Sequence, residues 1–187
     1  MKTLSHKRIF LGIVPPQDVI HTLRRSVASY KNEKWAGEVK WVKPVNLHLT
    51  LKFVGNVAVG ELETLVSTAE TAISSFGSFE IGITGLKIFP KPSRPSVICA
   101  GTGKNLPLLT LAKTIEDSLA GDGSPIEKRG FKGHITLGRC KKSFPRKQKI
   151  YDIIEATSFS ANEIIIFQSI LRPNGPEYRV EKKIRLG

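Results

Sequence analysis

The stretch NLHLTLKFVG, residues 46–55, alternates apolar and polar side chains more clearly than any other part of the sequence. Side chains two positions apart lie on the same face of a β-strand, so the pattern predicts a strand with one buried and one open face. The alternation assigns the buried face to Leu47, Leu49, Leu51 and Phe53, and the open face to His48, Thr50 and Lys52.

The tetrapeptide HLTL at 48–51 returns as HITL at 134–137, inside a second alternating segment at 131–139. Each copy places an imidazole and a hydroxyl side by side on one strand face: His48 with Thr50, and His134 with Thr136. A single histidine on a strand is more often structural than catalytic. Two of the chain's four histidines lie in this repeat, however, and the recurrence favours a functional pair.

The segments around the repeat predict an α/β (α+β) fold. We expect a bilobal arrangement of two pseudo-symmetric, mostly antiparallel sheets with helices outside and a central cleft. Residues 1–187 would form this single domain, with the motifs at 48–51 and 134–137 facing each other. Hydrophobic periodicity predicts strands over 8–14, 39–43, 46–55, 79–89, 96–101, 131–139, 163–172 and 178–186, and helices over 17–31, 60–75, 106–119 and 146–156.

Charge points to a polyanionic partner. The formal net charge is +13, and residues 128–149 contain nine Lys or Arg and no Asp or Glu. Such a balance favours RNA or DNA ahead of a membrane surface. Cys99 and Cys140 are too few for a disulfide framework and are expected to be free thiols. No apolar stretch approaches the ~20 residues of a membrane span, so we expect a cytoplasmic protein.

Paired histidines and threonines suit phosphodiester hydrolysis. One imidazole can take a proton from water while the other gives a proton to the departing oxygen. Threonine hydroxyls can donate hydrogen bonds to the phosphate oxygens. The sequence has no HExxH, CxxC or Asp-rich metal motif, so we expect neither a metal nor a cofactor. The candidate catalytic residues are His48, Thr50, His134 and Thr136.

The two motifs resemble the paired H-x-S/T-x motifs of the 2H phosphoesterase superfamily. Their context resembles one branch, the bacterial and archaeal RNA 2′,3′-cyclic phosphodiesterases, also called 2′-5′ RNA ligases. The resemblance covers nearly the whole chain, with one departure: Gly133 replaces the usual Pro before the second motif histidine. The matching segments are Arg8-Ile9-Phe10, Trp41 through Gly55, Arg129 through Arg139, and Ser169, Leu171, Gly175 and Tyr178.

This resemblance implies opening of a terminal 2′,3′-cyclic phosphate on RNA to a 2′-phosphate, and in some members reversible joining of tRNA halves. It implies that His48 is the proton donor and His134 the proton acceptor, although the near-symmetric motifs themselves do not assign these roles. We expect a monomer. Candidate substrate-binding residues are Arg139, Arg129, Lys52, Phe10 and Phe131. Among the aromatic residues, Phe10, Trp41 and Phe131 could stack on a base.

Arg139 reaches the side of His134 only if the strand bulges or ends at Gly138, because strict alternation places it with Ile135 and Leu137. Two other functions remain open on the sequence. One is a related enzyme that acts on a small nucleotide cyclic phosphate. The other is a non-catalytic RNA-binding module that keeps the cleft.

Overall fold

The computed structural model describes residues 5–91, 93–120, 130–146, 148, 150 and 157–187. Its helices are α1 (Gln17–Ala28), α2 (Leu62–Ile73) and α3 (Leu106–Leu119). Its strands are β1 (His6–Ile13), β2 (Val39–Trp41), β3 (Leu49–Ala58), β4 (Phe79–Ile83), β5 (Leu86–Lys91), β6 (Arg94–Gly101), β7 (His134–Cys140), β8 (Thr157–Ala161), β9 (Glu163–Arg172) and β10 (Gly175–Arg185).

The strands form one large sheet and one small one, and all described pairs are antiparallel. The large sheet has the order β10-β9-β1-β3-β7-β6-β5, with β2 also paired to β7, and β4 pairs with β8 in the small sheet. The α+β prediction is confirmed. The predicted pair of sheets is instead one hydrogen-bonded sheet with two halves, because β3 and β7 pair at its centre.

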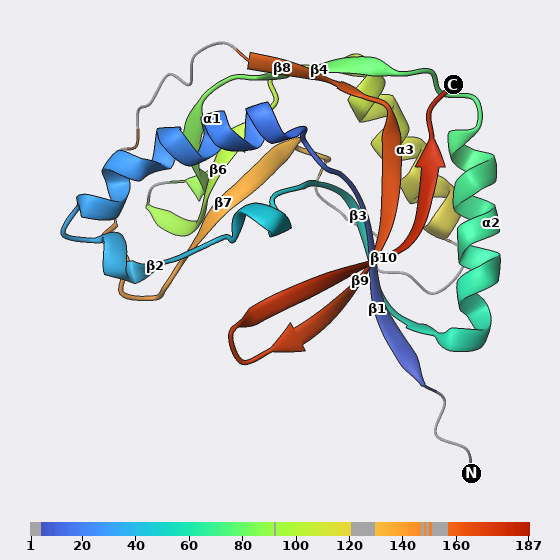
Figure 1. The fold of residues 1–187 in the computed structure, drawn as a ribbon, viewed down its shortest axis with the longest axis horizontal. Helices are drawn as coiled ribbons and strands as arrows, with labels where there is room; N and C mark the ends of the chain where they lie inside the picture. Colours follow the sequence, from blue (N-terminus) through green and yellow to red (C-terminus); the bar gives the residue numbers. More distant parts are fainter. Residues whose placement is uncertain (1–4, 92, 121–129, 147, 149, 151–156) are drawn as a thin grey trace.

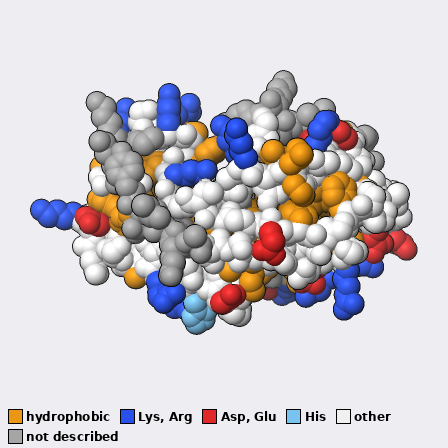
Figure 2. Space-filling model, turned by 90° about the horizontal axis from the view of Figure 1, so that it is seen from above, with side chains coloured by type: hydrophobic (Ala, Val, Ile, Leu, Met, Phe, Trp, Pro, Cys, Tyr) orange, Lys and Arg blue, Asp and Glu red, His pale blue; other side chains and the backbone are white. Residues whose placement is uncertain are grey.

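Helices cover the two halves separately. α2 and α3 pack against each other beside β3, β9 and β10, whereas α1 lies over β6 and β7 in the view of Figure 1. Asn105 caps α3, since its side chain accepts a hydrogen bond from the Leu108 amide at 3.0 Å. Positively charged side chains are spread over the face in Figure 2 rather than gathered in one patch there.

The sequence prediction was wrong for residues 79–89. The single strand expected there is two strands, and they belong to different sheets. The chain turns between them at Gly85, whose φ of 116° is a conformation that glycine adopts readily and other residues rarely do. Strand β8 was not predicted. The helix predicted over 146–156 lies largely outside the described residues.

No helix in the described part of the chain is long and apolar enough to cross a membrane.

Gly12 lets β1 approach the first histidine motif closely. A Cβ added at Gly12 would lie 2.8 Å from the Leu49 carbonyl oxygen and 3.5 Å from Cδ2 of His48. The nearer atom belongs to the backbone, so it can move only if the β1–β3 pairing shifts.

We therefore expect Gly12→Ala to lower the free energy of unfolding by about 1–3 kcal/mol, the usual cost of forcing extra volume into a packed interior. Urea unfolding would measure it. Gly82→Ala in β4 is the matched control, because an added Cβ there meets nothing within 4 Å. Equal effects of the two substitutions would contradict this account of Gly12.

Candidate active site

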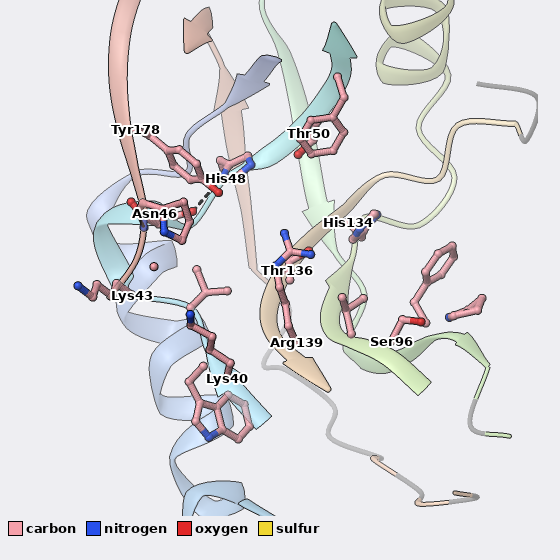
Figure 3. A pocket seen from close by; sticks show the side chains of 18 of the residues that line it. Lys40, Lys43, Asn46, His48, Thr50, Ser96, His134, Thr136, Arg139 and Tyr178 are labelled. Atoms are coloured by element: carbon pink, nitrogen blue, oxygen red, sulfur yellow. Dashed lines mark hydrogen bonds between the residues drawn. The ribbon is translucent and has the colours of Figure 1, made fainter. Parts of the chain in front are cut away.

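The two histidine motifs meet through one residue pair. In the described part of the chain, Leu49 of β3 pairs with Ile135 of β7, and this is the pair that joins the two strands. Antiparallel pairing of the central residues places His48 across from Thr136, and Thr50 across from His134. All four side chains line one cavity of about 660 Å³, into which Figure 3 shows them converging from the two strands.

Both histidines are held in the same orientation. Nδ1 of His48 lies 2.7 Å from the Asn46 carbonyl oxygen, and Nδ1 of His134 lies 2.7 Å from the Lys132 carbonyl oxygen. A carbonyl oxygen only accepts, so Nδ1 donates in each case. Nε2 is therefore the ring nitrogen left for proton exchange in both motifs.

The surroundings of the two histidines differ. His48 lies against Phe10, with ring centroids 4.9 Å apart, and meets Tyr178 edge-on at 5.2 Å. Burial lowers the pKa of His48, and the positive charges of Arg139 and His134 add to the lowering, while the hydrogen bond to Asn46 opposes it. His134 instead stacks on Phe89 at 5.5 Å, with an angle of 15° between the rings.

The cavity is electropositive. Four cationic residues line it, and none of its described lining residues is Asp or Glu. Such a wall attracts a phosphate and can form charge-assisted hydrogen bonds with its oxygens. The four are Lys40, Lys43, Arg94 and Arg139.

Arg139 reaches the cavity because β7 bulges. Thr136 pairs with Cys99 and Gly138 pairs with Ile98, so Leu137 is an extra residue relative to β6. The bulge restores Arg139 to the side of His134 and Thr136. For Arg139 to reach this face, the sequence pattern required a bulge near Gly138, and that bulge is confirmed. Its role in substrate binding stays a prediction.

The prediction for Lys52 was wrong. Leu51 and Val54 are extra residues of β3 in its pairing with β1, and these bulges reverse the alternation. The Lys52 side chain is 1% exposed and forms an ion pair with Glu116 of α3 at 2.9 Å. Phe53 faces the cavity in its place.

The aromatic predictions also need correction. Phe10 is 1% exposed and packs beneath His48, so no base can stack on it. Phe131 is half-buried against the hydrophobic core and is not part of the cavity wall. Trp41 does line the cavity. Arg129 lies outside the described residues.

Sequence reasoning missed several residues of the site, among them three that lie beside the histidines or position their strands. Asn46 donates from Nδ2 to the Pro176 carbonyl oxygen at 2.8 Å, which ties the β9–β10 hairpin to the loop before His48. Tyr178 lies on that hairpin, and Phe89 lies within β5. Tyr178 was part of the family pattern, which was the one available signal for it. The pairing of Phe89 with His134 depends on tertiary structure alone.

Gly133 fits closely against the neighbouring chain. A Cβ at this position would lie 2.2 Å from Oγ1 of Thr102 and 3.0 Å from a methyl group of Leu108. The family pattern has Pro at the position of Gly133. In this chain, Thr102 occupies the space that a side chain at position 133 would need. The motif itself is intact.

The chain is similar to a known family and to several of its members. Residues 13–99 match the family model described as LigT like phosphoesterase. The RNA 2′,3′-cyclic phosphodiesterase of Archaeoglobus fulgidus is 32% identical over 176 residues, covering 92% of this chain and 96% of that protein. The RNA 2′,3′-cyclic phosphodiesterase of Methanocaldococcus jannaschii is 30% identical over 182 residues, covering 94% of this chain and 99% of that protein.

Solved structures share the fold. The crystal structure of E. coli LigT with 3′-AMP has a TM-score of 0.84 and 22% identity, covering 97% of this chain and 99% of that one. A Thermus thermophilus protein has a TM-score of 0.78 and 25% identity, covering 96% and 97%. With two histidine motifs paired across one sheet and full-length relatives at this identity, the chain belongs to the RNA 2′,3′-cyclic phosphodiesterase family of LigT-like phosphoesterases.

Proposed function

We propose that this protein hydrolyses a 2′,3′-cyclic phosphate at the end of an RNA and leaves a 2′-phosphate. The observation that carries the proposal is the pair of imidazoles, each held through Nδ1 with Nε2 available, in one cationic cavity. The curated relatives are RNA 2′,3′-cyclic phosphodiesterases, which supports the same substrate class.

In the proposed step, a water oxygen forms a bond to phosphorus while the bond from phosphorus to O3′ breaks. Nε2 of His134 takes the water proton, and the protonated Nε2 of His48 gives its proton to O3′. Thr50 and Thr136 donate hydrogen bonds to the non-bridging oxygens, and Arg139 adds charge. The two histidines then exchange protons with solvent and return to their starting states.

The lowered pKa of His48 affects the proposed role in two ways. It makes the protonated ring a stronger acid, and it makes that form a minority of the free enzyme at neutral pH. A bound phosphate carries a negative charge next to the ring, which favours its protonated form again. Binding of the substrate therefore favours the protonated form of His48 that the proposed step requires.

We further propose that residues 1–187 act as one two-lobed domain and as a monomer, since both motifs and the described cavity wall come from a single chain. The same step with an RNA 5′-hydroxyl in place of water would join two RNAs, such as tRNA halves, through a 2′-5′ linkage. His134 would then take the proton of the 5′-hydroxyl, and His48 would give its proton to O3′ as in hydrolysis.

Removal of either motif histidine tests the chemistry. His48→Ala and His134→Ala are each expected to reduce kcat for an RNA cyclic phosphate at least ~10²-fold, in line with the usual contribution of a general acid or base. His21→Ala, on the exposed side of α1, is the control. Activity should persist in excess EDTA. Loss of turnover in EDTA would overturn the metal-free mechanism, and an unchanged kcat in both variants would overturn the two-histidine mechanism. Absence of turnover in the wild-type protein, with RNA binding unaffected by either substitution, would favour a non-catalytic binding module.

Product analysis tests the regiochemistry. Breaking the bond to O3′ leaves a 2′-phosphate, which ³¹P NMR or chromatography against standards distinguishes from a 3′-phosphate. We expect the 2′-phosphate alone. A 3′-phosphate would mean that the leaving oxygen is O2′ and that the cyclic phosphate binds in the opposite orientation.

The pH profile tests the role of His48. If His48 is the donor, kcat/KM falls as pH rises through its pKa, which lies below the ordinary value of about 6.5. Arg139→Gln removes a positive charge that disfavours the protonated ring, so this pKa rises and the descending limb moves to higher pH. Arg94→Gln is the control, because Arg94 lines the cavity without acting on the pKa of His48.

NMR titration of the His48 ring in both variants would measure the pKa shift directly. An unchanged or lower pKa in Arg139→Gln would contradict the electrostatic account. A kcat/KM that rises with pH through the pKa of His48 would make His48 the acceptor.

A further inference from the structure

A row of apolar side chains crosses the sheet beside the cavity. Phe53 of β3 pairs with Phe10 of β1, Phe10 pairs with Phe167 of β9, and Phe167 pairs with Val180 of β10. Directly paired residues share a face of the sheet. Ring contacts confirm this for the aromatic members, with centroids 5.8 Å apart for Phe10 and Phe53 and 4.9 Å apart for Phe10 and Phe167.

The two ends of this row are exposed. Phe53 is 56% exposed and Val180 is 52% exposed, while the two phenylalanines between them are buried. Three inter-strand spacings of about 4.8 Å place the ends roughly 14 Å apart. Lys52, next to Phe53, points to the opposite face and pairs with α3, so the row lies on the face that α3 does not cover.

This face is continuous with the cavity. Phe53 and Tyr178 belong both to the cavity wall and to the face. Tyr178 packs edge-on against Phe10, and their centroids are 4.9 Å apart.

The face also carries a positive charge. Arg8 is exposed and lies two residues before Phe10 on β1, opposite the exposed Asn56 of β3. Side chains two residues apart on a strand share a face, so Arg8 lies on the same face as Phe10, which contacts Tyr178. No carboxylate pairs with Arg8 within the described residues.

We propose that the sheet face formed by Arg8, Phe53, Tyr178 and Val180 is a track for single-stranded RNA upstream of the nucleotide whose phosphate is cleaved. The chemistry is that of known single-strand binders: an exposed ring on which a base stacks, and a cation that meets the backbone. Continuity with a cationic cavity and the unpaired guanidinium favour RNA over an apolar protein partner. The inference rests on the proposed function, because it takes the cavity to hold the RNA end.

The proposal makes affinity depend on RNA length. The probe is a 5′-fluorescein RNA that ends in a 2′-phosphate, of two or six nucleotides, with binding measured by fluorescence anisotropy. The wild-type protein should bind the six-nucleotide RNA more tightly. Phe53→Ala should weaken six-nucleotide binding about tenfold, as loss of one base stack does, and weaken two-nucleotide binding less. Leu106→Ala, which removes an exposed apolar side chain at the start of α3, should weaken neither.

Arg8→Gln gives a second, independent readout. Loss of one phosphate contact should reduce the slope of log Kd against log salt by about 0.7 for the six-nucleotide RNA. Arg24→Gln, which removes the same charge from an exposed position on α1, should leave the slope unchanged. If the two arginine variants change the salt slope equally, Arg8 contributes only to the overall charge of the protein and not to a local phosphate contact. That result would overturn the track.

The failure of this inference differs from the failure of the proposed function. Equal wild-type affinity for both RNA lengths, with normal hydrolysis of a cyclic mononucleotide, would overturn the track alone. Absence of hydrolysis with length-dependent binding intact would overturn the catalytic proposal alone. Concentration-dependent dimerisation that Phe53→Ala abolishes in analytical ultracentrifugation would assign the face to a second copy of the chain and overturn the RNA track.

Discussion

The pairing of Leu49 with Ile135 is the constraint on which the site depends. Both side chains are fully buried, and they join the two halves of the sheet at its centre. Because each lies between a histidine and a threonine, one antiparallel contact brings two acid–base groups and two hydroxyls to one cavity. A shift of one residue in this pairing would turn one motif away from the cavity and into the core. Hydrophobic burial of the central residues thus fixes the chemistry of their neighbours.

Bulges decide which other side chains reach the cavity. The alternation of NLHLTLKFVG correctly predicts the faces of His48 and Thr50, because the bulge lies beyond them. It fails at Lys52 and Phe53, which exchange faces after the extra residue Leu51. A bulge depends on the pairing of two strands, so the alternation of one strand does not contain it. For Arg139 the sequence showed only that a bulge would change the face of this side chain. The pairing of β7 with β6 shows that the bulge exists.

Much of the fold followed from local patterns. The three helices and the long strands around both motifs have strong periodicity and were predicted, as were the two strands of the β9–β10 hairpin. What escaped prediction depends on distant partners. Strand β8 is a short polar stretch, TSFSA, that forms a strand because β4 pairs with it. The stacking of Phe89 on His134 likewise requires that the β5–β6 hairpin and β7 lie together.

The symmetry of the motifs is broken by their surroundings. Both imidazoles make the same hydrogen bond to a carbonyl two residues earlier, so sequence and local geometry treat them as equivalent. Burial against Phe10 and Tyr178, with Arg139 nearby, disfavours the charged form of His48. A duplicated motif can therefore supply two unlike groups, because proton affinity is set by desolvation and neighbouring charge rather than by the motif. The division of labour between acid and base comes from the residues around the repeat.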